Sequence, residues 1–340
     1  MIPHANFAVH EPSQVGAARR HAARLADALG FDDVAAGRVA LVVTELGNNL
    51  VRHAQRGRLL VGARTERDVP CIEVLSLDHG PGMADVEACL ADGYTSGSTP
   101  GTGLGAARRL ASDFHYYSKV DQGTVILARM RAGTAGRRAA DGAFSHGGVC
   151  LAAPGEVVSG DGWAYAEHAH GACLMMADGL GHGPDAAIAS DGATGLLPLH
   201  AALAPGELLR KVHGALSGTR GAAVAIYALD AAGAGVTTCG AGNIAGRLIS
   251  GNSDRTLLTQ HGTAGVQIRQ PQEQRSDWPP HALLIVHTDG LRTRWNLSAA
   301  ADLVQCDVTV VAAWLIRDHC RGRDDATVVV VRRNASHLPS

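Results

Sequence analysis

The sequence has few aromatic residues, little net charge and no long apolar run. Phe, Trp and Tyr make up 4% of its 340 residues, too few for the aromatic platforms on which nucleic-acid bases stack. A formal net charge of −2 argues against nucleic acid or an anionic membrane as the principal partner. No apolar stretch approaches the roughly 18 residues that a membrane-spanning helix needs. These shortages favour a globular protein outside the main nucleic-acid-binding and membrane classes.

The cysteines also lack the spacing of a metal or redox motif. They are seven in number, an odd count, with no Cys-x-x-Cys pair, so we expect reduced and mostly buried thiols. The N-terminal residues have neither the basic nor the apolar region of a secretory signal. We therefore expect a cytoplasmic protein. Its length favours two domains, each able to bury its own core.

In the second half, four aspartates each stand at the end of an apolar run typical of a buried strand. Asp178 follows Leu174–Ala177 and precedes glycines that let the backbone come close to a ligand. Carboxylates that bridge two cations about 3.5–4 Å apart can orient a water for attack on phosphorus. For any single aspartate, an ordinary turn after a strand is the alternative. The acidic positions are Asp161, Asp178, Asp289 and Asp325, and Gly179 can add its carbonyl oxygen.

Four motifs in order, Gly-Asp, Asp-Gly-x-Gly-His-Gly-x-x-Ala, Asp-Gly-Leu and Asp-Asp-Ala-Thr, resemble the SpoIIE-like branch of the metal-dependent serine/threonine protein phosphatases. RsbX-like members are closest in scale, and Cys239–Ile244 is similar to a glycine-rich strand junction in that group. The resemblance covers about residues 146–333 and implies a PPM-type α-β-β-α sandwich holding a pair of Mn²⁺ or Mg²⁺ ions. It implies metal ligands at Asp161, Asp178, Gly179, Asp289 and Asp325, with catalytic roles for Asp178 and Asp289.

In the first half, a predicted helix that Asp32 or Asp33 can cap, and that reaches to about Ala54, carries Glu45 and Asn49 four residues apart, and therefore on one face. A carboxylate and an amide so placed can act as a general base and an oxygen ligand for Mg²⁺, or can belong to a solvated helix face. Further on, Asp78 ends a predicted strand and opens a glycine turn. An acid in that position can accept a hydrogen bond from the amino group of adenine.

Gly101, Gly103 and Gly105 open another predicted helix. Amide N–H groups exposed at a helix N-terminus cradle phosphate. A dinucleotide-binding fingerprint is the competing interpretation, but it requires a strand just before the glycines. The stretch Tyr94–Pro100 is rich in Gly, Ser and Thr and does not look like a strand, so we reject that interpretation.

Together these motifs resemble the GHKL (Bergerat) ATP-binding fold, an α/β sandwich, over about residues 5–130. The RsbT/RsbW-like serine kinases that phosphorylate STAS-domain proteins fit best. The resemblance implies that ATP and Mg²⁺ bind here. It implies that Glu45 activates the substrate hydroxyl, Asn49 holds Mg²⁺, Asp78 contacts adenine, Gly80 and Gly82 shape its pocket, Gly101, Gly103 and Gly105 line the phosphates, and Thr124 lies either near adenine or in the core.

We therefore expect an α+β protein with a GHKL serine kinase-like domain at 1–130, a linker at 131–145, a phosphatase domain at 146–333 and a tail at 334–340. It would phosphorylate and dephosphorylate STAS-domain proteins of the anti-sigma antagonist or stressosome type. Kinases of this kind often form homodimers. Two alternatives stay open. In one, a non-catalytic, ATP-sensing or partner-binding first domain gates the phosphatase; in the other, the protein binds an anti-sigma or sigma factor.

Overall fold

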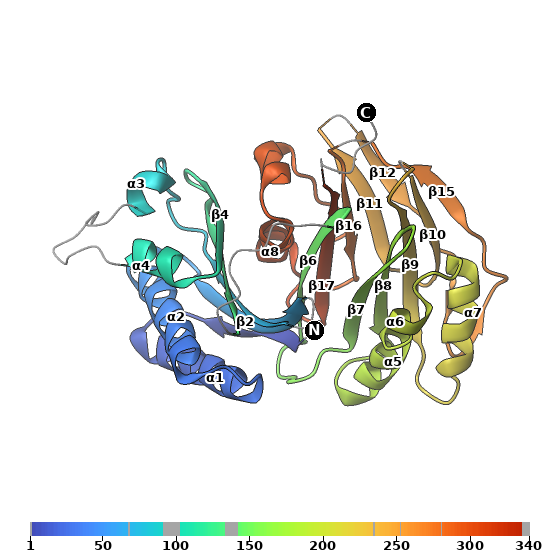
Figure 1. The fold of residues 1–340 in the computed structure, drawn as a ribbon, viewed down its shortest axis with the longest axis horizontal. Coiled ribbons are helices and arrows are strands. Elements are labelled where there is room, and N and C mark those ends of the chain that lie inside the picture. The colour runs from blue at the N-terminus through green and yellow to red at the C-terminus, as the bar shows by residue number, and fades with distance from the viewer. Residues whose placement is uncertain are drawn as a thin grey trace. The chain divides into compact units, whose positions relative to one another are not determined.

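The chain separates into two compact units in the computed structural model (Figure 1). Unit 1 comprises residues 1–139 and 305–317, and unit 2 comprises residues 140–304 and 318–340. A short segment from late in the chain therefore belongs with the first half. The residues that the structure describes are 2–66, 69–90, 103–132, 142–233, 235–251, 253–279 and 281–334.

Unit 1 is an antiparallel sheet, in the order β1-β2-β3-β5-β4, with helices packed on one face. The helix α2 starts where the Asp32 side chain accepts a hydrogen bond from the Ala35 amide at 2.7 Å. Its apolar stripe, which includes Val39 and Leu46, is fully buried against the sheet. The described elements are β1 (Ile2–Ala8), α1 (Pro12–Ala28), α2 (Asp33–His53), β2 (Arg58–Glu66), β3 (Val69–Leu77), α3 (Val86–Leu90), α4 (Gly103–Leu110), β4 (Asp113–Lys119), β5 (Gly123–Arg131) and α8 (Val308–His319).

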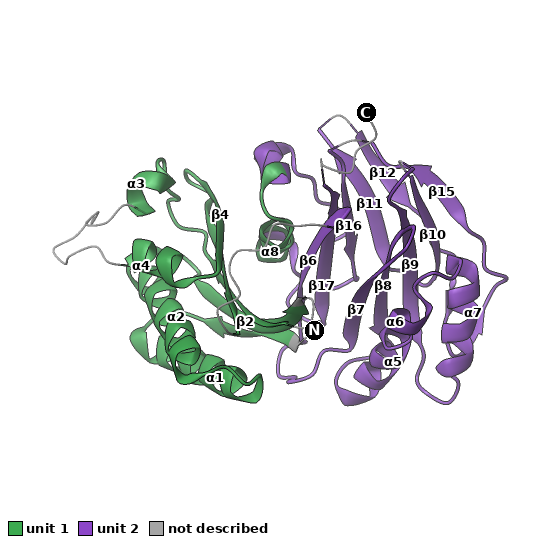
Figure 2. Ribbon diagram, in the orientation of Figure 1, with its two compact units in different colours: residues 1–139, 305–317 green, residues 140–304, 318–340 purple. Residues whose placement is uncertain are grey.

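The sheet of unit 1 is buried on both faces. Successive strand residues point to opposite sides, so Ile126 of β5 joins the core under α1 and α2 while Leu127 and Arg129 lie on the other face. Arg129 there donates a hydrogen bond to Thr309 Oγ1 of α8 at 2.8 Å. Helix α8 is apolar on all sides and buried from Val308 to Arg317. Figure 2 accordingly shows α8 in the colour of unit 1.

Unit 2 contains two antiparallel sheets, β15-β10-β9-β8-β7 and β12-β11-β16-β17-β6. One apolar core joins residues of both sheets, such as Leu174 of β8 and Val286 of β16, and a second joins the first sheet to α5 and α7. The described elements are β6 (Phe144–Leu151), β7 (Asp161–His168), β8 (Gly171–Gly179), α5 (Pro184–Thr194), α6 (Leu197–His200), α7 (Pro205–Ala215), β9 (Ala222–Asp230), β10 (Gly235–Ala241), β11 (Ala245–Ser250), β12 (Ser253–Leu257), β13 (Gly262–Thr263), β14 (Gln267–Ile268), β15 (Gln274–Asp277), β16 (Leu283–His287), the 3-10 segment η1 (Ser298–Gln305) and β17 (Ala326–Arg333).

The expected fold class, two mixed domains of sheets and helices, is confirmed. Helix α8 lies late in the chain, but most of it groups with unit 1. A helix that is apolar all round needs neighbours on every side, and its sequence alone does not say which. None of the helices in the described ranges has the length and apolarity that crossing a membrane would take.

Candidate active sites

The aspartates of unit 2 meet at one end of its sheets. Asp161 and Asp178 are paired positions on the neighbouring strands β7 and β8. Asp289 follows β16, and Asp324 precedes its neighbour β17. Thr288 Oγ1 donates a hydrogen bond to Asp161 Oδ2 at 2.7 Å, which ties the two sheets together beside these acids. Acidic residues far apart in the chain are therefore close in space, as the sequence predicts.

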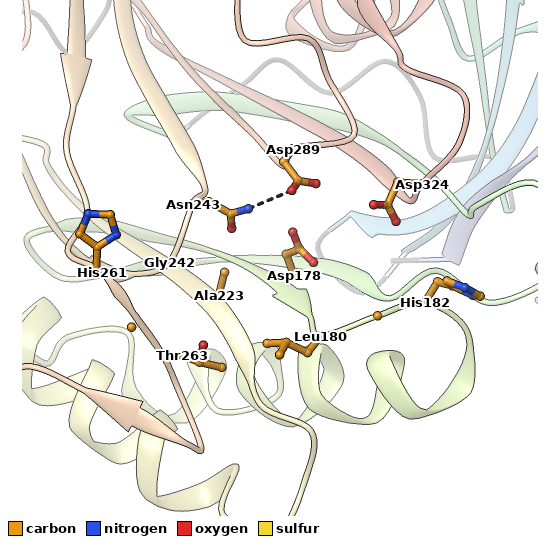
Figure 3. Close-up of a pocket in the computed structure, with 12 residues that line it drawn as sticks. Asp178, Leu180, His182, Ala223, Gly242, Asn243, His261, Thr263, Asp289 and Asp324 are labelled. Atoms are coloured by element: carbon orange, nitrogen blue, oxygen red, sulfur yellow. Dashed lines mark hydrogen bonds between the residues drawn. The ribbon is translucent and has the colours of Figure 1, made fainter.

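A pocket of about 520 Å³ opens over these carboxylates. Figure 3 shows Asp178, Asp289 and Asp324 turned toward one another across it. On one side Asn243 Nδ2 donates a hydrogen bond to Asp289 Oδ2 at 2.9 Å. Asn243 is not among the residues that the motifs predict, although it lies in the glycine-rich junction Cys239–Ile244. The other lining residues are Leu180, Gly181, His182, Ala223, Gly242, His261, Gly262 and Thr263.

The two acids before β17 have different environments. Asp324 lines the pocket, whereas Asp325 is buried and its two oxygens accept hydrogen bonds from the amides of Ala153, at 2.8 Å, and Gly160, at 3.0 Å. Asp325 therefore holds two loops in place. This geometry favours Asp324, in place of Asp325, as the ligand of a cation.

We expect Asp324→Asn and Asp325→Asn to separate these two roles. Asp324→Asn should weaken binding of Mn²⁺ without lowering the free energy of unfolding of the metal-free protein, because its carboxylate lies among other acids. Asp325→Asn should lower that free energy by about 1–3 kcal/mol, because one buried amide loses its acceptor. Calorimetric titration with Mn²⁺ and urea unfolding in a chelator measure the two effects. If both substitutions changed Mn²⁺ affinity and the free energy of unfolding equally, Asp324 and Asp325 would not have separate roles.

Burial and like charge dominate the electrostatics of the pocket. Burial raises the pKa of Asp178 to about 7, and the charges of Asp289, Asp324 and Asp325 push it in the same direction. Burial, followed by the charge of Asp178, raises the pKa of Asp161 well above its usual range. Carboxylates held together in this way repel one another, and a divalent cation would relieve the repulsion.

The donor set of the pocket fits a hard cation. Carboxylate and carbonyl oxygens are the ligands that Mg²⁺ and similar ions take in proteins. Within the described residues, no three His, Cys, Asp or Glu side chains are grouped closely enough to hold an ion by themselves. An ion bound through fewer protein oxygens completes its coordination with water, as Mg²⁺ commonly does.

The turn after Asp178 is held by close packing. The Gly179 amide donates a hydrogen bond to Gly160 O at 3.0 Å, and a Cβ at Gly179 would lie 2.1 Å from Ala186 O of α5. Only glycine fits there. That fit explains the residue type, and the role of its carbonyl as a metal ligand stays a prediction.

In unit 1, Glu45 and Asn49 lie one turn apart on α2, and Glu45 is close to the start of α4. A Cβ built on Gly103, the first residue of α4, would lie 3.6 Å from Glu45 Oε2. Gly105 is buried two residues further into the helix. Gly101 lies outside the described residues. The structure therefore brings the proposed base next to the glycine-initiated helix predicted to hold phosphate.

Asp78 is also placed as the sequence predicts, directly after β3. Its Oδ1 accepts a hydrogen bond from the Gly80 amide at 2.7 Å, and its own amide donates to Thr124 O at 3.0 Å. Burial raises the pKa of the Asp78 carboxyl. Gly82 has a φ of +69°, and a Cβ there would lie 2.1 Å from Lys119 O, so only glycine suits this turn.

Fold and sites together define a two-domain enzyme, and comparison with known proteins identifies each domain. Residues 8–130 match the histidine kinase-like ATPase domain, and residues 168–334 match Stage II sporulation protein E (SpoIIE). Over 112 residues the chain is 30% identical to the serine/threonine-protein kinase RsbT of Bacillus subtilis (strain 168). The matched segment is 33% of this chain and 84% of RsbT. The chain therefore belongs, through its first part, to the RsbT family of protein kinases.

Two solved structures share a fold with 56% of this chain. One, from work on the bacterial stressosome as a modular system adapted to control secondary messenger signalling, is 25% identical, with a TM-score of 0.52 and 99% of its chain covered. The other, RsbX in complex with magnesium, is 20% identical, with a TM-score of 0.50 and 96% of its chain covered.

The expected family resemblance is confirmed. The protein joins an RsbT-like kinase domain of the ATP-binding GHKL class to a SpoIIE-type protein-serine/threonine phosphatase domain, whose class depends on divalent metal.

Proposed function

We propose that this protein sets the phosphorylation state of a STAS-domain regulator in both directions. Unit 1 transfers the γ-phosphoryl group of ATP to a serine or threonine, and unit 2 removes it by hydrolysis. The hydrolytic half is supported above all by the convergence of Asp178, Asp289 and Asp324 in one pocket. The transfer half is supported by Glu45 next to the first turn of α4.

In unit 2, Asp178, Asp289 and Asp324 hold a pair of Mn²⁺ or Mg²⁺ ions, with the Gly179 carbonyl as a further ligand. When bound, such ions polarise a phosphate and lower the pKa of a water molecule. Asn243 fixes the orientation of the Asp289 carboxylate through its 2.9 Å hydrogen bond. That contact leaves the second oxygen of Asp289 available to an ion.

Asp161 is a buried carboxylate next to these ligands. Its Oδ2 is held by Thr288, and it is paired across the strands with Asp178. We assign it to the metal site either as a direct ligand or through a water molecule. Its burial keeps bulk solvent away from that side of the pocket.

In unit 1, Glu45 accepts the proton of the substrate hydroxyl, and Asn49 contributes an oxygen to the Mg²⁺ that accompanies ATP. Asp78 accepts a hydrogen bond from the adenine amino group, with Gly80 and Gly82 allowing the close turn. The amides that begin α4, at Gly103 and Gly105, face the phosphates. Catalysis of this kind depends mainly on positioning and on neutralising charge.

The choice of substrate rests on relatives. The RsbT likeness and the likeness to a chain studied with the bacterial stressosome favour a STAS-domain protein of the stressosome or anti-sigma antagonist type. A phosphate adds about −1.5 to −2 charges to such a protein at neutral pH, enough to change which partner it binds. The two activities would thereby reverse one another on one switch.

Intact-mass measurement tests this proposal. A STAS-domain protein incubated with the full chain, ATP and Mg²⁺ should gain the mass of one phosphoryl group. After ATP is removed and Mn²⁺ is added, the same protein should lose that mass. A STAS protein with its acceptor serine or threonine replaced by alanine is the control. If neither gain nor loss occurs on any STAS protein while both metal and ATP bind, the substrate assignment is wrong.

A further inference from the structure

We propose that α8 couples the two active sites, so that occupation of the adenine site in unit 1 tightens divalent-metal binding in unit 2. The chain passes from unit 1 into unit 2 inside this helix, between Arg317 and Asp318. Before that point, Arg317 contacts Asp78 of the adenine site in unit 1. After it, Arg321 contacts the turn that follows Asp289 in unit 2. The inference rests on the proposed function, because it takes unit 1 to bind adenine and unit 2 to bind metal.

The start of α8 is fixed to the sheet of unit 1 by a buried ion pair. Arg129 donates to both oxygens of Asp307, at 2.9 and 3.1 Å, and its Nε donates to Glu73 at 2.8 Å. Such two-pronged contacts between guanidinium and carboxylate fix orientation as well as distance. The guanidinium of Arg129 and the carboxylate of Glu73 are almost completely buried. Helix α8 is therefore held firmly on the sheet that carries Asp78 and Thr124.

The last turn of α8 in unit 1 touches the adenine site directly. Arg317 Nη1 donates a hydrogen bond to the backbone carbonyl of Asp78 at 2.9 Å. The guanidinium carbon lies 3.4 Å from the ring centroid of Trp314, and that ring meets Tyr117 of β4 edge-on at 4.7 Å. A Cβ at Gly123 would lie 2.2 Å from the same Asp78 carbonyl. The carbonyl is thus confined, and a movement of Asp78 would be passed to Arg317.

Beyond the helix, the chain braces the turn that carries Asp289. The Arg321 amide donates a hydrogen bond to Gly290 O at 2.8 Å, and Arg321 Nε donates to Leu291 O at 3.1 Å. Three residues later the chain reaches Asp324. Asp289 therefore lies on a turn that is hydrogen-bonded to the segment after α8, and Asp324 lies on that segment itself.

These contacts form a short path from Asp78 to Asp289 and Asp324. A packed helix moves as a unit and does not deform continuously, so a change at Arg317 is felt at Arg321. A ligand that restricts the motion of Asp78 also restricts the motion of Asp289 and Asp324. The metal then loses less conformational entropy when it binds, so it binds more tightly. Linkage makes the effect reciprocal, since metal must tighten adenine binding by the same factor.

Mn²⁺ titration of the full chain with and without saturating adenosine tests the coupling. Adenosine carries the amino group that Asp78 recognises but has no phosphate to chelate Mn²⁺, so the titration reports the pocket of unit 2. We expect adenosine to tighten Mn²⁺ binding by about fivefold or more. Unchanged or weakened Mn²⁺ affinity, with adenosine shown to bind, overturns the inference alone. Failure of adenosine or of Mn²⁺ to bind overturns the proposed function together with it.

Arg317→Lys is the informative variant, because lysine keeps the charge but lacks the flat guanidinium that both stacks and donates. It should bind Mn²⁺ within about twofold of wild type without adenosine and lose the adenosine effect. Arg19→Lys, on the exposed side of α1, is the matched control and should keep the effect. An adenosine effect of full size in Arg317→Lys contradicts a path through α8.

Hydrogen exchange gives a second readout that needs no variant. The amide of Arg292 donates to His319 O at 3.0 Å, and the Arg321 amide donates to Gly290 O. Adenosine should slow exchange at both amides although neither lies in unit 1. Exchange that stays the same at both overturns the coupling.

Discussion

Asp178→Asn is expected to reduce phosphate hydrolysis by more than about 100-fold while leaving phosphoryl transfer by unit 1 intact. Asp178 is a pocket carboxylate whose pKa is raised by burial and then by the charges of Asp289, Asp324 and Asp325. Changes to residues that merely support a metal ligand already cost about 10- to 100-fold. Loss of a ligand should cost more. Release of phosphate from a phosphorylated STAS protein in Mn²⁺ measures hydrolysis, and the gain of mass with ATP measures transfer.

The same substitution should stabilise the metal-free protein at neutral and higher pH. The pKa of Asp178 is about 7 in the folded protein against 3.8 for an ordinary aspartate, so the fold favours the protonated form. This preference does not penalise folding well below pH 3.8, and stability is lost as the pH rises toward and through 7. Asparagine removes that loss, which is at most about 4 kcal/mol for three pKa units.

Urea unfolding in a chelator, at about pH 4 and about pH 8, measures this difference. Asp178→Asn should exceed wild type in stability at the higher pH and differ little at the lower one. Asp191→Asn, on the exposed side of α5, is the matched control and should change neither value. Lower stability of Asp178→Asn at about pH 8 would show that the carboxylate is not strained by its neighbours.

Glu45→Gln is expected to lower phosphoryl transfer by about 10²- to 10⁴-fold, the usual contribution of a general base. Glutamine keeps the size of the side chain beside Gly103 but cannot take the proton of the substrate hydroxyl. Affinity for ATP should change by less than about twofold, because the adenine contacts lie elsewhere. Intact mass of a STAS protein over time measures transfer, and calorimetry measures ATP binding.

Glu207→Gln, an exposed position on α7, is the matched control for this experiment. Equal transfer by wild type and Glu45→Gln would remove Glu45 from the chemistry. If both were silent while ATP still bound, unit 1 would be a nucleotide sensor. The phosphatase predictions for Asp178 would stand in either case.

Local patterns in the sequence were sufficient for much of the fold. A cap at Asp32 or Asp33 predicts a helix that reaches to about Ala54, and the structure has α2 at Asp33–His53. Strand-length apolar runs likewise predict that Asp178 and Asp289 stand at the ends of strands. Asp178 is the last residue but one of β8, and Asp289 lies two residues after β16. Such features depend on neighbours within a few residues, which is why composition and period reveal them.

The sequence does not show which of two adjacent aspartates lines the pocket. Asp324 and Asp325 are identical adjacent residues, and the sequence does not distinguish them. Only Asp325 accepts hydrogen bonds from the amides of Ala153 and Gly160, which are more than 160 positions away, and so holds those two loops. Asn243 reaches Asp289 only because β11 pairs with β16, a contact that no local pattern predicts.

The sequence by itself determined which segments become helices and strands, and which classes of chemistry the two halves carry, because period, glycine turns and acidic strand ends are local properties. Tertiary structure alone decided that α8 packs on the sheet of unit 1 and that Arg317 bonds to Asp78. A helix apolar on every side fits many surfaces equally well. Its partner is selected by long-range contacts such as Arg129 with Asp307, and no local pattern encodes these.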